Sequence, residues 1–183
     1  MELTNQILIA LPKLANPFFN RSVIYMVQHD RFGAAGLIIN HPTHSRASDI
    51  MTHLDIEHGI IHQDLIVLDG GPVSTENGFV LHSPVEHWQN TAPINNHIAL
   101  TTSQDILAAI AANEPPENYL FTLGHCRWYG DQLEQEIRED YWLVAPSTRE
   151  LLFHTPYSER YQKALRLAGI QFPLALAEFS GHA

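Results

Sequence analysis

The stretch SVIYMVQHDRFGAAGLIIN (residues 22–40) indicates the fold class of this chain. Residues 22–27 are rich in β-branched and aromatic side chains, which is typical of a strand, and residues 36–40 form a second apolar run after a turn at residues 29–33. An apolar run at residues 7–11 predicts an earlier strand that stops at Pro12. The first two strands alternate poorly, which predicts burial on both faces. Three strands with short connections favour antiparallel hairpin pairing over regular β-α-β winding.

The rest of the chain mixes strands with helices. Further strands are expected at residues 65–68, 78–82, 97–100, 119–123 and 141–145. Residues 47–54 are a helix candidate, and three capping patterns predict later helix starts: Thr102-x-x-Asp105, Asp131-x-x-Glu134 and Ser147-x-x-Glu150. Thr155-Pro156 precedes the last helix, and Gly169 ends it. We therefore expect a single α+β domain over residues 1–183, with a mixed, largely antiparallel twisted sheet flanked by helices.

Charge, hydropathy and cysteine content predict which partners this chain does not bind and where in the cell it lies. The net charge is -10, and the ten Lys and Arg residues form no basic run, so we expect no direct nucleic-acid binding. No stretch approaches the roughly 20 apolar residues of a membrane helix. The start of the chain lacks the basic segment of a signal peptide, and Cys126 is the single cysteine. These features predict a cytoplasmic protein that is not a membrane protein and has no internal disulfide.

Several motifs occur in an order that resembles the AlgH/YqgE family of bacterial proteins. They are LIALP (8–12), NPFFNRSVIY (16–25), GAAGLIINHP (33–42), GGPV (70–73), GFVLH (78–82), Leu123-Gly124, Trp128, Gln132-Leu133-Glu134-x-Glu136, Trp142-Leu143 and Gly181-His182-Ala183. The resemblance covers almost the whole chain. It implies one α+β domain in the cytosol and a regulator linked to transcription, and it implies no particular reaction, because the family has no agreed biochemical activity.

The chain departs from the family pattern in the segments that carry it. Asn16 stands where the family usually has an aspartate, Arg127-Trp128 where it commonly has Gly-Trp, and Asp131 where it commonly has a glycine. A family site that used a carboxylate or a flexible glycine at these positions is altered here.

The loop before residue 22 holds the most suggestive polar groups. Arg21 offers a planar fork of donors for a carboxylate or a phosphate, and Ser22 adds a hydroxyl group. A hairpin brings the start of one strand beside the end of the next, so Arg21 and Ser22 are expected to face Asn40. We consider one candidate polar cleft, formed by Arg21, Ser22, His29, Asn40 and Glu134. The alternative is structural, with Arg21 holding loop carbonyls or an acidic partner.

Other motifs point to structure rather than chemistry. The glycines at residues 33–36 and 70–72 lack the Lys-Ser/Thr of a P-loop, so we expect tight turns that need positive φ angles. His125 and Cys126 are neighbours at the end of an expected strand, where they would point to opposite faces, which opposes a base–nucleophile pair. The histidines, including His53, His58 and His62, lack a clear zinc spacing, and we expect neither a metal nor another cofactor.

Two classes of function remain open. The first is a non-catalytic binding or regulatory protein whose partner is an unknown protein or a small anionic ligand. The second is a hydrolase or transferase that acts on a small anionic substrate near Arg21. A pocket where Arg21, His29 and Glu134 converge would favour the enzyme, and a flat apolar patch there would favour a protein partner.

Overall fold

The computed structural model describes residues 2–58 and 65–170. The chain falls into two compact units, which we describe separately. Unit 1 comprises Met1–Asn40 and Cys126–Ala183, and unit 2 comprises His41–His125. One domain over the whole chain stays a prediction.

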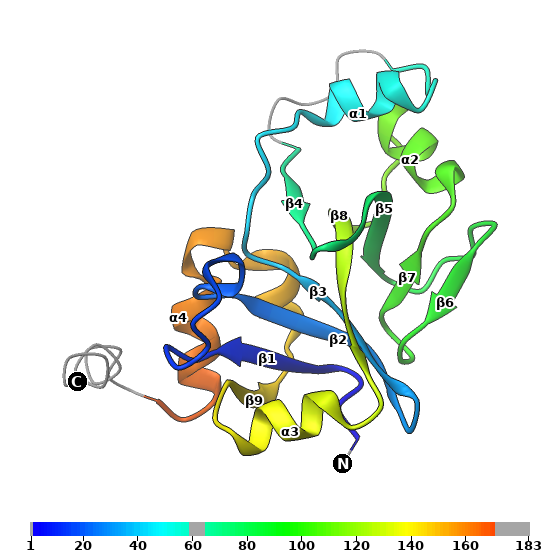
Figure 1. The fold of residues 1–183 in the computed structure, drawn as a ribbon. Coiled ribbons are helices and arrows are strands. Elements are labelled where there is room, and N and C mark those ends of the chain that lie inside the picture. The colour runs from blue at the N-terminus through cyan, green and yellow to red at the C-terminus, as the bar shows by residue number, and fades with distance from the viewer. Residues whose placement is uncertain (1, 59–64, 171–183) are drawn as a thin grey trace. The chain divides into compact units, whose positions relative to one another are not determined.

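Unit 1 is built on an antiparallel sheet. Its strands are β1 (Gln6–Ala10), β2 (Val23–Asp30), β3 (Gly33–Ile38), β9 (Trp142–Pro146) and the last four residues of β8 (Asn118–Tyr129), in the order β8-β3-β2-β1-β9. Ile24 lies opposite Ile38, and Asp30 lies opposite Gly33. The predicted pairing of the first three strands is therefore confirmed (Figure 1).

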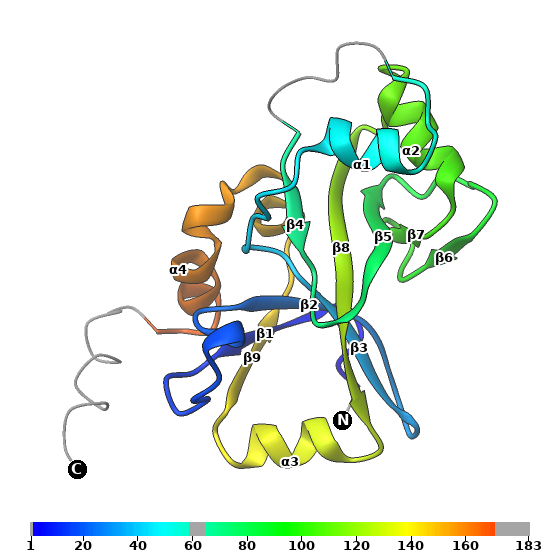
Figure 2. The ribbon, with the colours of Figure 1, turned by 45° about the horizontal axis from the view of Figure 1, so that its top comes forward.

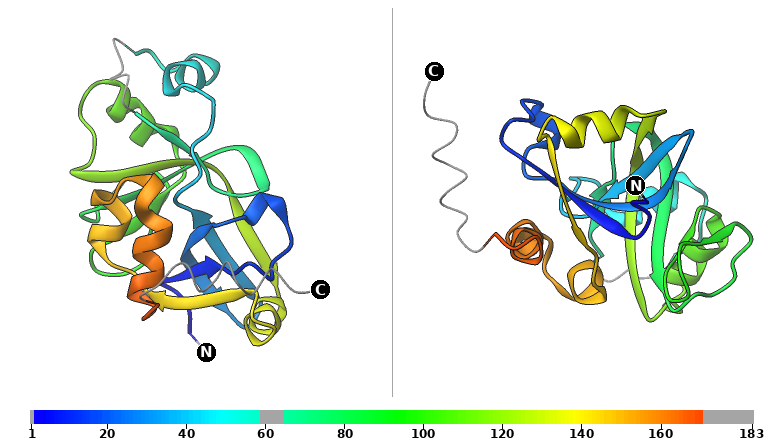
Figure 3. Two further views of the ribbon diagram at one scale, coloured as in Figure 1. Left: turned by 90° about the vertical axis from the view of Figure 1, so that its left-hand side faces the viewer. Right: turned by 90° about the horizontal axis from the view of Figure 1, so that it is seen from below.

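Helices cover both faces of this sheet, as the view from below shows (Figure 3). α3 (Gln132–Arg138) lies on one face, and η2 (Glu150–His154, a π-helix) and α4 (Tyr157–Leu167) lie on the other. The α3 face buries Leu8, Ala10, Ile24, Met26, Ala34, Ile38, Cys126, Trp128, Leu133 and Trp142. Alternation along β1 and β2 directs Ile7, Ile9, Val23 and Tyr25 to the α4 face. Burial on both faces was expected for these two strands, and it explains why they do not alternate with polar residues.

Unit 2 has a smaller sheet with one parallel pair. Its strands are β4 (Val67–Asp69), β5 (Val73–Ser83), β6 (Thr91–Pro93), β7 (Ala99–Thr101) and residues 118–125 of β8. β4 pairs with β8 in parallel, whereas β5–β8, β5–β7 and β6–β7 are antiparallel (Figure 2). α1 (Ala47–His53) and α2 (Gln104–Ala111) pack on this sheet through Met51, Ile106, Leu107 and Ile110.

The α+β class with a mixed, largely antiparallel sheet is thus confirmed, but several strands differ from expectation. β2 runs to Asp30 and β3 begins at Gly33, so His29 lies in a strand and not in the turn, and β5 begins at Val73 instead of residue 78. β8 does not stop at Leu123; it continues through Gly124 to Tyr129. Gly124 has φ +72, a conformation that would end most strands, and a Cβ there would lie 2.3 Å from the carbonyl oxygen of Gly71. Residues 91–93 form a short edge strand that was not predicted.

The helix starts lie close to the predicted ones, but the side chains named as caps make no capping bond. Asp131 makes no side-chain capping bond, and Ser147 Oγ donates to the carbonyl oxygen of Asn5 (2.7 Å). Thr148 Oγ1 instead accepts from the backbone N–H of Leu151 (3.1 Å). Ser147 and Thr102 thus bind groups of other segments instead of the helix ends that the local pattern assigns to them. Within residues 2–58 and 65–170, no helix is long and apolar enough to cross a membrane.

Candidate functional site

A strained turn presents Arg21. η1 (Pro17–Phe19), a 3-10 helix, leads into it, and Asn16 caps η1 by accepting a hydrogen bond from the backbone N–H of Phe18 (3.0 Å). The carboxamide of Asn16 therefore performs a capping role for which an aspartate would also serve. Arg21 itself has φ +55, the left-handed conformation that favours glycine and costs other residues about 1–2 kcal/mol. Backbone strain of this kind is a reason to look for a function.

Asn40 holds the strained turn in place. Its Nδ2 donates to the carbonyl oxygen of Arg21 (2.8 Å), and its Oδ1 accepts from the backbone N–H of Val23 (2.8 Å). The predicted proximity of Arg21 and Asn40 is confirmed. Both ends of the Asn40 amide bind backbone groups, so this side chain acts as a brace for the turn.

Two neighbouring residues of α4 complete a group that we call the guanidinium corner (Arg21, Asn40, Arg160 and Tyr161). The Arg21 guanidinium lies over the Tyr161 ring, with its Cζ 4.7 Å from the ring centroid. The Tyr161 hydroxyl donates to the carbonyl oxygen of Ala10 (2.9 Å), and burial raises the pKa of Tyr161. The corner thus sits at the end of the β1–β2–β3 part of the sheet, on the α4 face.

Arg160 is a buried cation, with 5% of its surface exposed. Its Nε donates to the carbonyl oxygen of Thr155 (3.0 Å), and its Nη1 donates to that of Ile39. Burial lowers the pKa of Arg160 to about 10, so the side chain remains charged at neutral pH. Sequence analysis missed this residue, although its position carried a signal: Arg160 falls on the helix stripe that also buries Tyr161, Ala164 and Leu165.

The guanidinium corner has positive charge with no matching carboxylate among residues 2–58 and 65–170. Within the described part of the chain, neither Arg21 nor Arg160 forms an ion pair. Arg160 uses two of the five guanidinium donors for carbonyl oxygens. Buried charges are normally paired, because an isolated charge loses its hydration. The arrangement therefore suits a carboxylate or phosphate group.

Ser22 does not join this corner. It is fully buried, and alternation places it on the α3 face with Ile24 and Met26, away from Tyr161. The adjacent Arg21 and Ser22 therefore serve opposite faces of the sheet, and the two cannot bind one small ligand together.

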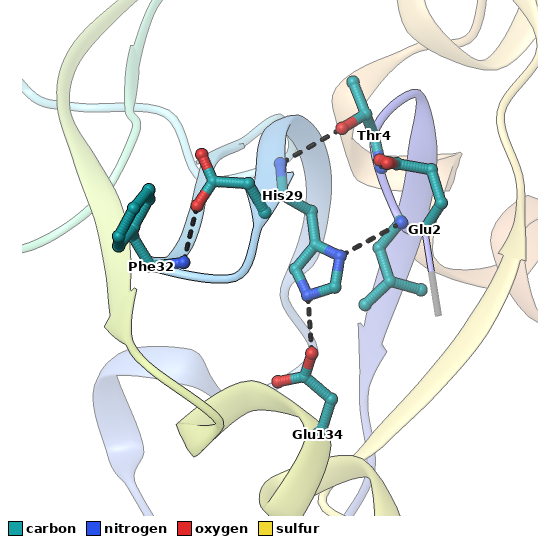
Figure 4. A network of polar contacts seen from close by, with 7 residues as sticks. Glu2, Thr4, His29, Phe32 and Glu134 are labelled. Atoms are coloured by element: carbon teal, nitrogen blue, oxygen red, sulfur yellow. Dashed lines mark hydrogen bonds and ion pairs between the residues drawn. The ribbon is translucent and has the colours of Figure 1, made fainter.

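His29 and Glu134 meet at the other end of β2 (Figure 4). A bulge between Met26 and Gln28 shifts the alternation, so that His29 lies opposite Ala34 on the α3 face. His29 Nδ1 accepts from the backbone N–H of Leu3 (3.3 Å), so its Nε2 carries the proton donated to Glu134 Oε1 (2.8 Å). Both ring nitrogens are occupied, and the imidazole ties the N-terminal segment to α3.

The residues of the expected cleft therefore form separate groups. Arg21 and Asn40 share the guanidinium corner, His29 and Glu134 form a second pair, and Ser22 lies apart. Seven residues of mostly extended chain lie between Arg21 and His29, and the eight residue steps span roughly 20–25 Å. The imidazole cannot act as a base at the guanidinium corner from that distance.

The remaining motifs have structural surroundings. Gly33 and Gly71 have φ +143 and +147, as predicted, but Gly36 lies inside β3 and neither Gly36 nor Gly70 has a positive φ, so the prediction was wrong for these two glycines. Cys126 is buried in the α3-face core, and His125 packs against Phe79 in unit 2. Among the described residues, no three His, Cys, Asp or Glu side chains are grouped to hold a metal ion, and His62 lies outside those residues.

A second buried histidine, His82 in unit 2, has a fixed proton arrangement. Its Nδ1–H donates to the carbonyl oxygen of Pro84 (3.2 Å), so Nε2 accepts from the Thr101 hydroxyl (2.9 Å). The Thr101 oxygen in turn accepts from Thr91 Oγ1 (2.7 Å). A charged imidazole could not accept the Thr101 bond, and burial lowers the pKa of His82.

We expect acid to destabilise the protein through His82. The unfolded chain takes up this proton near pH 6.5 and the folded chain only at lower pH, so stability is complete above 6.5 and falls as the pH drops below it. The effect is at most about 1.4 kcal/mol per pH unit. Urea unfolding at pH 7.5 and 5.5 should show a smaller pH dependence for His82→Gln than for wild type. The exposed His97→Gln is the control, and an equal change in both variants would contradict the assignment.

The comparisons with known proteins give the class of the chain. The model of the AlgH-like family (DUF179) matches residues 7–173, and the chain belongs to this family. A UPF0301 protein of Shewanella woodyi is 42% identical over 99% of this chain and 98% of its own length. A UPF0301 protein of Vibrio cholerae is 40% identical over the full length of both chains.

Two solved structures are similar to this one. The solution structure of the AlgH protein from Pseudomonas aeruginosa has a TM-score of 0.84 and 36% identity, covering 100% of this chain and 95% of that one. A crystal structure of a Corynebacterium diphtheriae protein has a TM-score of 0.70 over 97% of this chain and 91% of its own. At 19% identity, the second likeness shows the fold alone.

Proposed function

We propose that this chain is a non-catalytic binding protein that recognises a carboxylate or phosphate group at the guanidinium corner. The observation that carries the proposal is the pair of cations Arg21 and Arg160, for which the described residues supply no carboxylate. Arg21 presents its donors from a turn whose backbone would be relaxed by glycine. A side chain kept at a strained position supports a role beyond the turn itself.

The grouping of polar residues supports binding over catalysis. Acid–base chemistry needs a proton acceptor within hydrogen-bond reach of the reacting group. The His29 imidazole is engaged by Leu3 and Glu134 at the far end of β2, and Ser22 faces the opposite side of the sheet. A hydrolase or transferase at Arg21 would therefore lack His29 as a base and Ser22 as a nucleophile. A binding protein needs neither group, so the non-catalytic hypothesis fits the arrangement better.

The biological setting belongs to the same proposal. The family resemblance implies a regulator, and a regulatory protein can sense a small anion or the carboxylate of a partner protein with the same two cations. The net charge of -10 opposes a direct contact with nucleic acid, so a link to transcription would run through a protein or a metabolite. We place the protein in the cytoplasm on the grounds given by its sequence.

Substitution of Arg21 by glycine separates binding from folding. Glycine adopts φ +55 without strain, which offsets the lost stacking on Tyr161, so stability should change by less than about 1 kcal/mol. Wild type should be stabilised by inorganic phosphate or citrate at constant ionic strength, by about 2.7 kcal/mol at a hundred times Kd. Arg21→Gly should lose this response, and Arg21→Lys should weaken it because the ammonium lacks the planar fork.

The control is Arg138→Gln on α3, which removes an exposed arginine outside the corner and should keep the response. Thermal unfolding with and without each anion, with the ionic strength held constant by sodium chloride, measures the shift in the midpoint temperature. The proposal fails if neither anion stabilises wild type, or if Arg21→Gly responds as strongly as wild type does.

A further inference from the structure

A second surface of unit 1 exposes large aromatic side chains. Phe32 in the β2–β3 turn is 71% exposed, and Tyr129 at the end of β8 is 65% exposed. They are neighbours, because Tyr129 pairs with Gly33 and the backbone N–H of Gly130 donates to the carbonyl oxygen of Phe32 (3.0 Å). Figure 4 shows the Phe32 side chain directed away from His29. Exposed rings of this size at one place mark an interaction surface more often than scattered single residues do.

An arginine guanidinium stacks over each of the two rings. The Arg31 guanidinium lies 4.6 Å from the Phe32 centroid, and that of Arg127 lies 5.0 Å from the Tyr129 centroid. Neither arginine forms an ion pair with a described carboxylate. We call this group the aromatic–arginine patch (Arg31, Phe32, Arg127 and Tyr129). Its rings offer apolar contact, and its guanidinium groups keep donors available for an acceptor on a partner.

Acidic residues beside the patch are largely engaged in local structure. Asp30 accepts from the backbone N–H of Phe32 (2.7 Å) and from Gln28 Nε2 (2.8 Å). The bond from Phe32 lowers the pKa of Asp30. Asp131 stands at the N-cap of α3, where a negative charge is favoured. The positive groups therefore face outward on the rings, and the nearby negative ones serve the turn and the helix.

The patch stands on a rigid base. Gly33 holds φ +143, and a Cβ there would lie 2.2 Å from the carbonyl oxygen of Trp128, so the turn and β8 are in close backbone contact. A backbone held in this way loses little conformational entropy on binding. Tyr and Arg are also the residue types that most often dominate binding energy at protein interfaces.

We infer that the aromatic–arginine patch docks a short segment of a partner protein in which carboxylates flank an aromatic or aliphatic side chain. The arginines select the carboxylates, and the exposed faces of the two rings contact the apolar side chain. Four side chains are far fewer than the 20–30 residues per side of a standard interface, which favours a short segment over a second copy of this chain. A phosphate backbone needs a run of cations, and the ten Lys and Arg residues of this chain form no basic run, which disfavours nucleic acid.

A peptide selection tests this inference. A phage-displayed library of random dodecapeptides is panned on wild type, with the Phe32→Ser/Tyr129→Ser double variant as the counter-target. Enriched peptides are synthesised with a fluorophore and titrated by anisotropy. We expect acidic peptides with a central apolar residue, at least tenfold weaker on the double variant, and weakened by added salt. Arg31→Gln/Arg127→Gln should weaken binding at least threefold, whereas Arg138→Gln should not change it.

Several outcomes would overturn the inference. They are enriched peptides without acidic residues, equal binding to wild type and to the arginine double variant, tighter binding of a 20-nucleotide oligothymidylate, or self-association that the aromatic double variant abolishes. The arginine variant keeps both rings, so it tests the surface even if the aromatic variant misfolds. The phosphate response at the guanidinium corner is independent of all these measurements, and either idea can fail alone.

Discussion

Replacement of Glu136 by alanine is expected to lower the free energy of unfolding by about 2–5 kcal/mol, because two buried indole N–H groups lose their hydrogen-bond acceptor. Glu136 Oε2 accepts from Trp128 Nε1 (2.9 Å) and from Trp142 Nε1 (2.7 Å). The two indoles are 4% and 3% exposed and pack edge to face, with their centroids 6.0 Å apart. Without the carboxylate, both N–H groups would remain buried with no acceptor from Glu136.

Two matched variants make this result specific. Glu136→Gln keeps an acceptor oxygen but loses the charge, so its loss should be about 1 kcal/mol. Glu139→Ala, which removes a bond only to Gln135 on the same helix, should change stability by less than about 0.5 kcal/mol. Urea unfolding followed by tryptophan fluorescence measures all three. A loss of stability in Glu136→Ala no greater than in Glu139→Ala would contradict a stabilising role for the two indole–carboxylate hydrogen bonds.

The same carboxylate shows what a sequence pattern can and cannot predict. The pattern Asp131-x-x-Glu134 predicts that Glu134 takes part in capping a helix start. In the structure Glu134 binds His29, which lies on β2. Glu136 binds Trp128 on β8 and Trp142 on β9. Capping is a local rule, and a partner on another element changes the outcome without changing the local pattern.

The antiparallel start of the sheet was predictable because its signals are local and agree with one another. Residues 22–40 contain two apolar runs and one glycine-containing turn, and pairing across that turn fixes the position of Asn40 beside Arg21. The bulge after Met26 was not predictable, because nothing in the residues marks a one-residue shift. That shift decides that His29 rather than Gln28 faces Glu134.

Arg160 is the other part of the site that the sequence concealed. A helix with Arg160 next to Tyr161 looks amphipathic, and an arginine is usually assigned to solvent. Its burial depends on two carbonyl groups, one just before α4 and one at the end of β3, which the chain brings together only in the folded state.

Substitution of Arg160 by methionine is expected to cost about 3–5 kcal/mol, because the carbonyl oxygens of Ile39 and Thr155 lose their charged donor in a buried place. Methionine fills similar volume, so packing against Tyr161 changes little. Arg160→Lys retains the charge but cannot reach both carbonyls with a planar fork, and we expect it to lose about half as much. Urea unfolding monitored by circular dichroism gives these differences.

The response to anions then separates the two roles of Arg160. If its charge only braces the carbonyls, Arg160→Met will be less stable but will gain as much stability from phosphate as wild type does. If the charge also attracts an anion to the guanidinium corner, the phosphate response will fall in Arg160→Met and partly persist in Arg160→Lys. Measuring unfolding free energy with and without phosphate for wild type, Arg160→Met and Arg21→Gly completes the comparison, because Arg21→Gly removes a cation without removing a structural bond. Full retention of the phosphate response in Arg160→Met, together with its loss in Arg21→Gly, would leave Arg160 a purely structural residue.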